Sequence, residues 1–396
     1  MMLSFILILL LTTIAFQNSL AVEGETQDVG YTIKMRVTYS NPVNGTRIWN
    51  LTEEDRTIGL FMNNTWQRVQ LMSYSYLLEA LKVDENGNSI AVLSFPKSEL
   101  KPGENVSFSV MYYALSKPRS IPNIIENASE TLERIPADLS RKYCKEEGPW
   151  LVNEPELREL AHNLAENETR VLTIVKKFVA WIRDNIRYEF YESYLYPNET
   201  YAKLQGACAD QATLFITLCR IYGIPAYLQA GCIYLPETQT SETYYGGRMT
   251  ESLKQIGWHA WAIAYVPPWG WLPVDLTYVI GGFDDPFNAI KGGAVTFQRT
   301  IQYLNFTQTD YVASSREDRS FLMNNYFYVY IEDEMILDPS PEPPKPPEPP
   351  SDEIQGKPRL ISVLIVAAAV GVTLTGASMI VFVLYVRKAK KEKLSE

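Results

Sequence analysis

The sequence contains little of what metal, redox and disulfide-rich proteins need: it has only two histidines and four cysteines in 396 residues. Four cysteines are too few for a disulfide framework over this length. No group of His and Cys has the spacing of a metal site. Basic charge is also scarce, because 36 Lys and Arg stand against 46 Asp and Glu, a net charge of −10. We therefore expect no metal, no cofactor and no nucleic-acid partner.

Two segments lack charge altogether and are predicted to lie outside the soluble fold. Residues 1–21 are mostly apolar and have small residues at Ser19 and Ala21, which is typical of a signal peptide; an uncleaved anchor is the alternative. Residues 360–386 form an uncharged run of 27 residues, long enough to span a bilayer core of ~30 Å. The basic tail 387–396 follows and is expected in the cytoplasm. This predicts a single-pass cell-membrane protein whose bulk is extracytoplasmic.

Glycosylation signals and a proline-rich segment agree with that location. Residues 339–358 are predicted to form a stalk, because eight of the twelve residues from 339 to 350 are proline and favour extended polyproline II. An extracellular reader of PxxP motifs is the alternative. Eight N-x-S/T triplets, more than chance predicts, indicate surface glycosylation. They begin at Asn44, Asn50, Asn63, Asn105, Asn127, Asn167, Asn198 and Asn305.

The remaining chain divides into two predicted domains. Residues 22–120 carry short runs of period two, such as 31–39 and 106–112, separated by turn residues. This pattern predicts a small all-β sandwich-like domain, which shows no chemical site. Residues 121–338 are predicted to be α+β, with helical spacing over 156–166 and 170–186 and a strand pattern from Trp258 onward.

Cys208 stands at a predicted helix start. After Gly206-Ala207-Cys208 the apolar residues have helical spacing until Gly223-Ile224-Pro225 ends the helix. Free N–H groups and the positive dipole end at such a position stabilise a thiolate and can receive an oxyanion. A cysteine in a helical pattern is more often a small buried apolar residue, and that interpretation fits Cys219. Cys144 and Cys232 are left as a possible disulfide pair.

His259 is almost the only candidate for a general base. His162, the other histidine, lies in a polar-rich helical segment and is predicted to be structural. His259 lies in an alternating run that places it on one strand face with Trp261 and Ile263. A lone strand histidine is usually structural as well, but acid–base chemistry near neutral pH would need this one.

Asp275 is predicted to reach His259 across a hairpin. If Tyr265 opposes Trp271, Asp275 is the diagonal neighbour of His259 on the same face; a turn tighter by two would pair them directly. In both registers the carboxylate can hold the imidazole tautomer. A slip of one residue would turn Asp275 to the other face. Pro273 is expected at the outer edge of the hairpin or at a bulge.

Three stretches resemble motifs of the transglutaminase-like superfamily. They are FVAWIRDNIRYEF, GACADQATLFITLCRIYGIPAYLQAG and HAWAIAYVPPWGWLPVDLTY, and together they cover roughly residues 171–277. The resemblance implies a papain-like α+β core in which Cys208 is the nucleophile, His259 the base and acid, and Asp275 the residue that orients His259.

The same stretches depart from the family pattern at three positions. Tyr227 stands where many members have a basic residue, and Ile263 stands where they often have an acidic one. Leu276 follows Asp275 where proline is common. None of these positions belongs to the implied triad.

These observations predict a cell-surface thiol enzyme that acts on amide bonds of proteins or peptides at the cell envelope. Attack by the thiolate would give a thioester. Water as the second reactant would make the protein a peptidase or amidase, and an amine would make it a cross-linking acyltransferase. The alternative is a non-catalytic, surface-anchored binding or structural protein on the same fold.

Overall fold

In the computed structural model of this protein, the described residues are 28–118, 122–277, 289–290 and 300–338. The predicted signal peptide, stalk, membrane segment and basic tail all lie outside these ranges. Within the described ranges, no helix is both long enough and apolar enough to cross a membrane.

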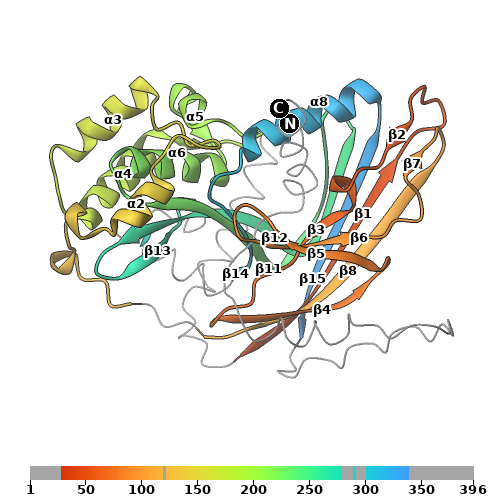
Figure 1. The fold of residues 1–396 in the computed structure, drawn as a ribbon, viewed down its shortest axis with the longest axis horizontal. Coiled ribbons are helices and arrows are strands. Elements are labelled where there is room, and N and C mark those ends of the chain that lie inside the picture. Colours follow the sequence, from red (N-terminus) through yellow and green to blue (C-terminus); the bar gives the residue numbers. More distant parts are fainter. Residues whose placement is uncertain (1–27, 119–121, 278–288, 291–299, 339–396) are drawn as a thin grey trace.

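One eight-stranded sheet organises the molecule (Figure 1). Its strands are β1 (Val29–Ser40), β4 (Gln67–Tyr74), β8 (Asn105–Ser116), β11 (Ala226–Tyr244), β12 (Met249–Val266), β13 (Gly270–Val274), β14 (Thr300–Phe306) and β15 (Tyr328–Asp338). They follow the order β14-β11-β12-β15-β1-β8-β4, and β13 pairs with the second half of β12. The antiparallel pair β11–β12 forms the spine of the sheet.

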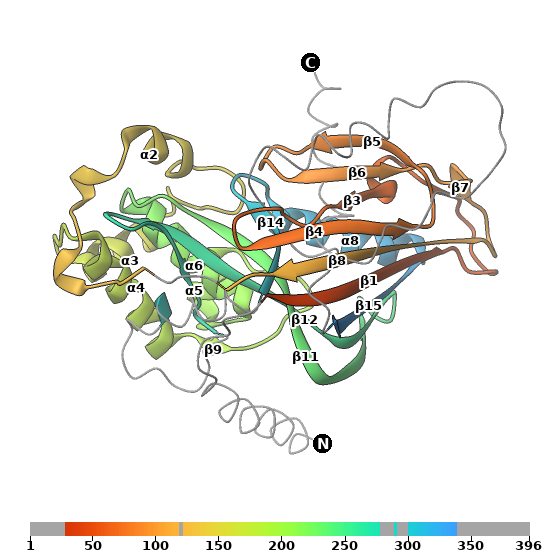
Figure 2. The ribbon, with the colours of Figure 1, turned by 90° about the horizontal axis from the view of Figure 1, so that it is seen from below.

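The strands predicted at 31–39 and 106–112 are present as β1 and β8. In β1 the residues Ile33, Met35 and Val37 are fully buried, as period-two alternation requires of one strand face. A smaller sheet lies as a second layer beside β4 and β8 (Figure 2). It contains β3 (Thr57–Gly59), β6 (Ser89–Leu93) and β5 (Leu78–Val83), while β2 (Trp49–Asn50) pairs separately with β7 (Glu99–Leu100).

The N-terminal strands β1, β4 and β8 do not form a sheet of their own. β1 pairs with β15 from Gly30 opposite Asp338 to Ser40 opposite Tyr328, and β15 also pairs with β12 in parallel. Strands of the predicted domains 22–120 and 121–338 therefore share one sheet. The alternating pattern could not indicate this shared sheet, because it predicts where strands are but not which distant strand pairs with the edge of each.

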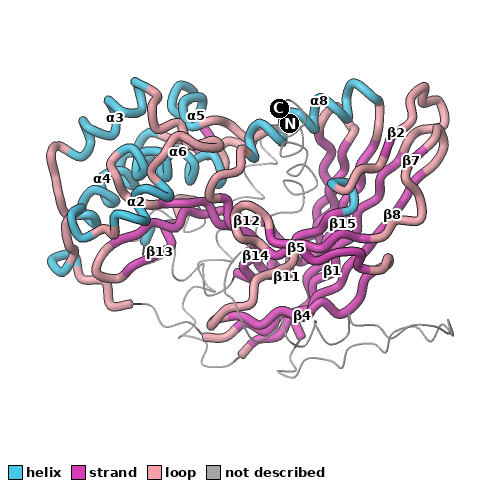
Figure 3. The backbone as a smooth tube through the Cα atoms, viewed as in Figure 1, coloured by secondary structure: helices cyan, strands magenta, loops and turns pink. Residues whose placement is uncertain are grey.

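The helices gather at one end of the sheet, except α8, which runs along its top in Figure 3. They are α2 (Ala137–Tyr143), α3 (Pro155–Ala165), α4 (Val171–Asn185), α5 (Pro197–Lys203), α6 (Cys208–Ile221) and α8 (Tyr311–Asn325). The predicted helices at 156–166 and 170–186 are present as α3 and α4. Helices α3, α4 and α5 surround α6, which also contacts β11 and β12. Every residue of α6 from Ala209 to Arg220 is buried, so this helix is held by packing on all sides.

All four cysteines are free, and the possible Cys144–Cys232 disulfide is not formed. Cys144 lies near Cys219, whereas Cys232 lies near Asp333 in another part of the core. Cys219 is fully buried in the apolar core, which confirms its predicted role.

Seven of the eight glycosylation-signal asparagines are exposed or half-buried, and Asn305 is buried. The Asn305 amide oxygen accepts a hydrogen bond of 2.9 Å from Gln229 Nε2, and its backbone N–H donates to Asn88 Oδ1. Because the Asn305 side chain is buried, this triplet is not a surface signal in the folded chain.

Candidate active site

Cys208 is the first residue of α6, as the sequence predicts. The helix begins there because Asp210 caps its first turn: Ala207 N–H donates to Asp210 Oδ2 at 2.9 Å. The other oxygen accepts from Leu195 N–H, also at 2.9 Å. A Cβ on Gly206 would lie 2.7 Å from the Cβ of Asp210, so only glycine fits before the nucleophile position. The spacing Gly-x-Cys-x-Asp is thus a single structural unit.

His259 and Asp275 are brought together. His259 Nε2 lies 2.9 Å from Asp275 Oδ2, and the two residues are 8% and 1% exposed. The other carboxylate oxygen accepts from Thr277 N–H at 3.1 Å. With Nε2 engaged by Asp275, Nδ1 is left as the nitrogen for proton exchange with a neighbouring group.

The hairpin register explains this contact. Tyr265 opposes Trp271 and Ala262 opposes Val274, which is the first of the two predicted registers. Asp275 follows the last paired residue and turns its carboxylate to the face of His259. Pro273 lies on β13, whose paired side in the described sheet is taken by β12 alone, so it occupies an edge strand as predicted.

The Cys208 side chain completes the cluster, because it lies close enough to His259 to influence the protonation of the imidazole. Burial alone would lower the pKa of the His259 imidazole. The charge and hydrogen bond of Asp275, together with the contact to Cys208, outweigh burial and raise this pKa well above its usual value near 6.5. The imidazolium form is therefore favoured at neutral pH. All three residues singled out from the sequence thus lie at one place.

Tyr188 was not predicted as a site residue, and the structure places it beside the thiol. Strand β9 (Arg187–Tyr188) pairs in parallel with β10 (Gln205–Gly206), which puts Tyr188 opposite Gly206, two residues before Cys208. Burial raises the pKa of Tyr188, and the nearby Cys208 and Asp210 raise it further. The residue is 49% exposed, so it borders both the thiol and solvent. The only sequence signal was the tyrosine within the first family-like stretch.

The other candidate sites in the sequence stay structural. His162 is exposed on α3, with its ring 5.5 Å from that of Tyr222. Within the described ranges, no three His, Cys, Asp or Glu side chains are grouped as metal ligands would be.

Two of the three departures from the family pattern are neighbours across strands. Tyr227 of β11 pairs with Ile263 of β12. Both belong to a buried cluster with Trp261, against which Tyr143 and Trp271 pack. Where many family members have a basic residue, and often an acidic one, this chain therefore has an uncharged pair inside an aromatic cluster. The two departures therefore occur together, at one paired position of β11 and β12, and β12 is the strand that carries His259.

Comparisons with known proteins show a family similarity in the segment that contains this site. Residues 158–276 match the sequence model of the transglutaminase-like superfamily. No curated protein matches the chain significantly. The fold resembles a candidate cysteine protease from Cytophaga hutchinsonii, at 15% identity over 79% of this chain and 90% of that one, with a TM-score of 0.47. It also resembles the periplasmic domain of TgpA from Pseudomonas aeruginosa, at 17% identity over 66% and 92%, with a TM-score of 0.31.

The family match begins within α3 and ends one residue after Asp275, so it contains Cys208, His259 and Asp275. The structure of this segment is mixed α+β, with a buried helix against a curled sheet. Residues 158–276 are therefore similar to the core of the transglutaminase-like superfamily.

Proposed function

We propose that this protein is a cell-surface thiol enzyme that acts on amide bonds of extracellular proteins or peptides. The observation that supports it most is the contact of buried His259 with both the Asp275 carboxylate and the Cys208 side chain. An imidazole held between a carboxylate and a thiol at a helix start is the arrangement that activates a nucleophile. The cell-surface location stays a prediction from segments 1–21 and 360–386.

The reaction proceeds in two halves. Cys208 Sγ, as thiolate, attacks the amide carbonyl carbon while His259 holds the proton. The C–N bond then breaks, the leaving amine takes the proton from His259, and a thioester remains on Cys208. In the second half, water or an amine attacks the thioester carbonyl and gives its proton to His259. The thiolate leaves, and the acid or the new amide is released.

Thiol labelling of the full-length chain tests this function. Iodoacetamide is expected to modify Cys208 faster than free cysteine at neutral pH, because the His259 imidazolium favours the thiolate. Cys144 is the internal control: burial raises the pKa of its thiol to about 11, so it should react slowly. Peptide mass spectrometry after timed labelling locates the modified residue.

The matched variants are His259→Ala and Cys208→Ala. The first should slow labelling at Cys208 and the second should remove it. If Cys208 reacts no faster than free cysteine, and no faster than in His259→Ala, the enzyme proposal fails and a non-catalytic binding role is the better account. Incubating the active chain with cell-envelope protein, with and without a primary amine, then distinguishes hydrolysis from transfer.

Tyr188 is the side chain that we propose to stabilise the oxyanion, together with the backbone N–H of Cys208. Its hydroxyl lies near Cys208 and forms no hydrogen bond with a described residue. Its raised pKa keeps it a neutral donor at physiological pH. Tyr188→Phe is expected to lower kcat/KM by about 100-fold, the cost of losing one oxyanion donor.

The iodoacetamide rate separates this role from a structural one. Alkylation forms no oxyanion, so Tyr188→Phe should leave the labelling rate of Cys208 within about twofold of the native chain. Tyr191→Phe is the matched control, because Tyr191 lies in the same loop and donates to Gln205 Oε1 at 2.7 Å. Equal losses of kcat/KM in both variants would contradict the assignment.

A further inference from the structure

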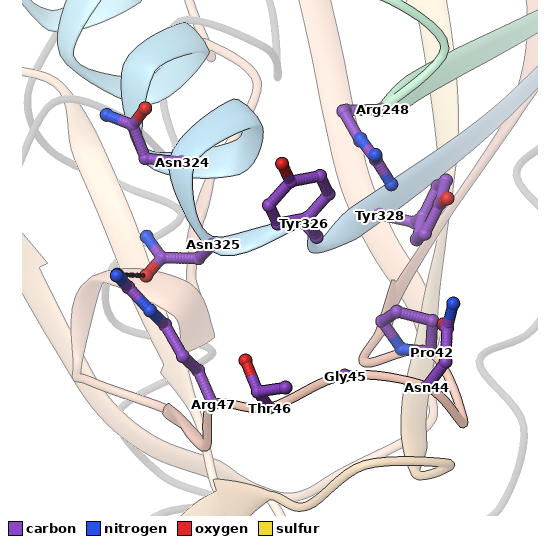
Figure 4. Close-up of a pocket in the computed structure, with 10 residues that line it drawn as sticks. All are labelled: Pro42, Asn44, Gly45, Thr46, Arg47, Arg248, Asn324, Asn325, Tyr326 and Tyr328. Carbon is purple, nitrogen blue, oxygen red and sulfur yellow. Dashed lines mark hydrogen bonds between the residues drawn. The ribbon is translucent and has the colours of Figure 1, made fainter.

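A polar pocket of about 470 Å³ lies at the C-terminal end of α8, within the size range of small-ligand sites (Figure 4). The loop 42–47, the turn between β11 and β12, and the junction of α8 with β15 form its walls. Two arginines, Arg47 and Arg248, line it, and the described lining includes no Asp or Glu. Two guanidinium groups thus face one cavity on a chain whose net charge is −10.

Arg248 is held in place by aromatic rings rather than by an acid. Its guanidinium carbon lies 4.8 Å from the ring centroid of Tyr326 and 4.6 Å from that of Tyr328. Figure 4 shows the side chain reaching between these two tyrosines. Stacking covers the faces of a guanidinium and leaves its N–H edge free, and that edge matches both oxygens of a carboxylate.

Arg47 stands at the opposite wall. Its Nη1 donates to Asn325 Oδ1 at 2.6 Å, and no described carboxylate forms an ion pair with either arginine. The Tyr326 ring projects from the end of α8, where its backbone has a φ of 60° and its side chain is 61% exposed. A left-handed residue commonly ends a helix, and here it places Tyr326 at the pocket wall.

A chain of contacts connects the pocket with the thiol. Tyr188, beside Cys208, is two residues from Phe190, whose ring lies 5.6 Å from that of Tyr244 at the end of β11. The Arg248 N–H donates to the Tyr244 carbonyl at 3.1 Å. The exposed Phe190 ring therefore lies between the thiol and the turn that carries Arg248.

We propose that this pocket binds a carboxylate on an acidic stretch of the peptide substrate, an inference that rests on the proposed thiol-enzyme function. The fork of Arg248 supplies the bidentate contact, and Arg47 supplies a second positive charge. The pocket thereby selects acidic substrates at a distance from the scissile bond.

The test measures binding without turnover, on the full-length Cys208→Ala chain in nonionic detergent, produced without N-glycans. A fluorescent hexaglutamate peptide is expected to bind at least about tenfold more tightly than hexaglutamine. Arg248→Gln should remove about tenfold or more of the hexaglutamate affinity, and Arg248→Lys should restore only part of it because lysine lacks the fork. Arg68→Gln is the matched control, since Arg68 is an exposed arginine on β4 without a described ion-pair partner.

The outcomes are distinct. Equal affinity for both peptides, or equal losses from Arg248→Gln and Arg68→Gln, would overturn the site. Tighter binding of a hexagalacturonate than of hexaglutamate would overturn the peptide assignment in favour of an acidic saccharide. If Arg248→Gln does not fold, Arg47→Gln gives the same test without disturbing the tyrosine contacts. Binding is measured on Cys208→Ala, which cannot turn over a substrate. An unreactive Cys208 thiol in the native chain would therefore contradict the enzyme proposal without changing the binding result.

Discussion

Replacing Asp275 with asparagine is expected to lower kcat/KM by about 10⁴-fold on the substrate identified with cell-envelope protein. Asparagine keeps the size and the hydrogen bond, but it removes the charge that stabilises the imidazolium of His259. Its amide can also donate to Nε2 and impose the tautomer in which Nδ1, the nitrogen left for Cys208, already carries a proton and cannot accept another. The loss should appear mainly in kcat, because Asp275 is 1% exposed and has no surface for substrate.

The same variant is expected to change the pH profile. Burial lowers the pKa of His259 and Asp275 raises it, so without the carboxylate charge the burial effect prevails and this pKa falls. The alkaline limb of kcat/KM, set by loss of the imidazolium, should lie well above pH 6.5 in the native chain and move to lower pH in Asp275→Asn. His162→Asn, which changes the exposed histidine, should alter neither rate nor limb. An alkaline limb that does not move in Asp275→Asn would contradict the role given to this carboxylate.

The parts of the site that the sequence predicted correctly are those fixed by local contacts. The start of α6 follows from Gly206 and the capping carboxylate of Asp210, all within a few residues of Cys208. His259 and Asp275 are 16 residues apart in one hairpin. The alternation of its strands and the length of its turn largely determine the register of this hairpin. Short loops leave few competing arrangements, so residue patterns are sufficient there.

The parts that could not be predicted depend on distant segments. Lys34 of β1 and Glu334 of β15 form an ion pair across 300 residues, and no pattern near either end specifies the partner. Tyr188 reaches the thiol through a parallel pair of two-residue strands, too short for a periodicity signal. The prediction of a possible Cys144–Cys232 disulfide is wrong, because the number of cysteines in a sequence does not indicate which thiols lie close together.

A second large effect is expected at Asp333, a buried carboxyl on β15. Trp258, the residue before His259, donates its indole N–H to Asp333 Oδ2 at 2.8 Å. Burial raises the pKa of Asp333 to about 8, opposed by the Trp258 hydrogen bond and assisted by the nearby Glu251. The Cys232 thiol and the Tyr303 hydroxyl also lie close to this carboxyl. No described residue bonds its other oxygen, so the ionised form is poorly solvated.

This shift makes the free energy of unfolding depend on pH in a defined direction. Asp333 binds its proton more tightly in the folded chain than in the unfolded chain, where its pKa is near 3.8. The stabilisation is complete below that value and is lost progressively as the pH rises toward 8. Since one pKa unit corresponds to about 1.4 kcal/mol, the loss is on the order of a few kcal/mol.

Asp333→Asn should therefore reduce the decline in unfolding free energy between pH 5 and 8, measured by urea denaturation of the full-length chain. Part of the decline should remain, because burial also raises the pKa of Glu251 to about 7 and that of Asp210 to about 6. The matched control is Glu334→Gln on the same strand. Ion pairs with Lys254 and Lys34 lower the pKa of Glu334, so its stabilisation is present at neutral pH and lost only in acid. Glu334→Gln should leave the neutral decline intact and flatten the acid limb instead. An unchanged decline in Asp333→Asn would show that this carboxyl is ionised in the folded protein and that Trp258 is held by a charge rather than by a neutral acid.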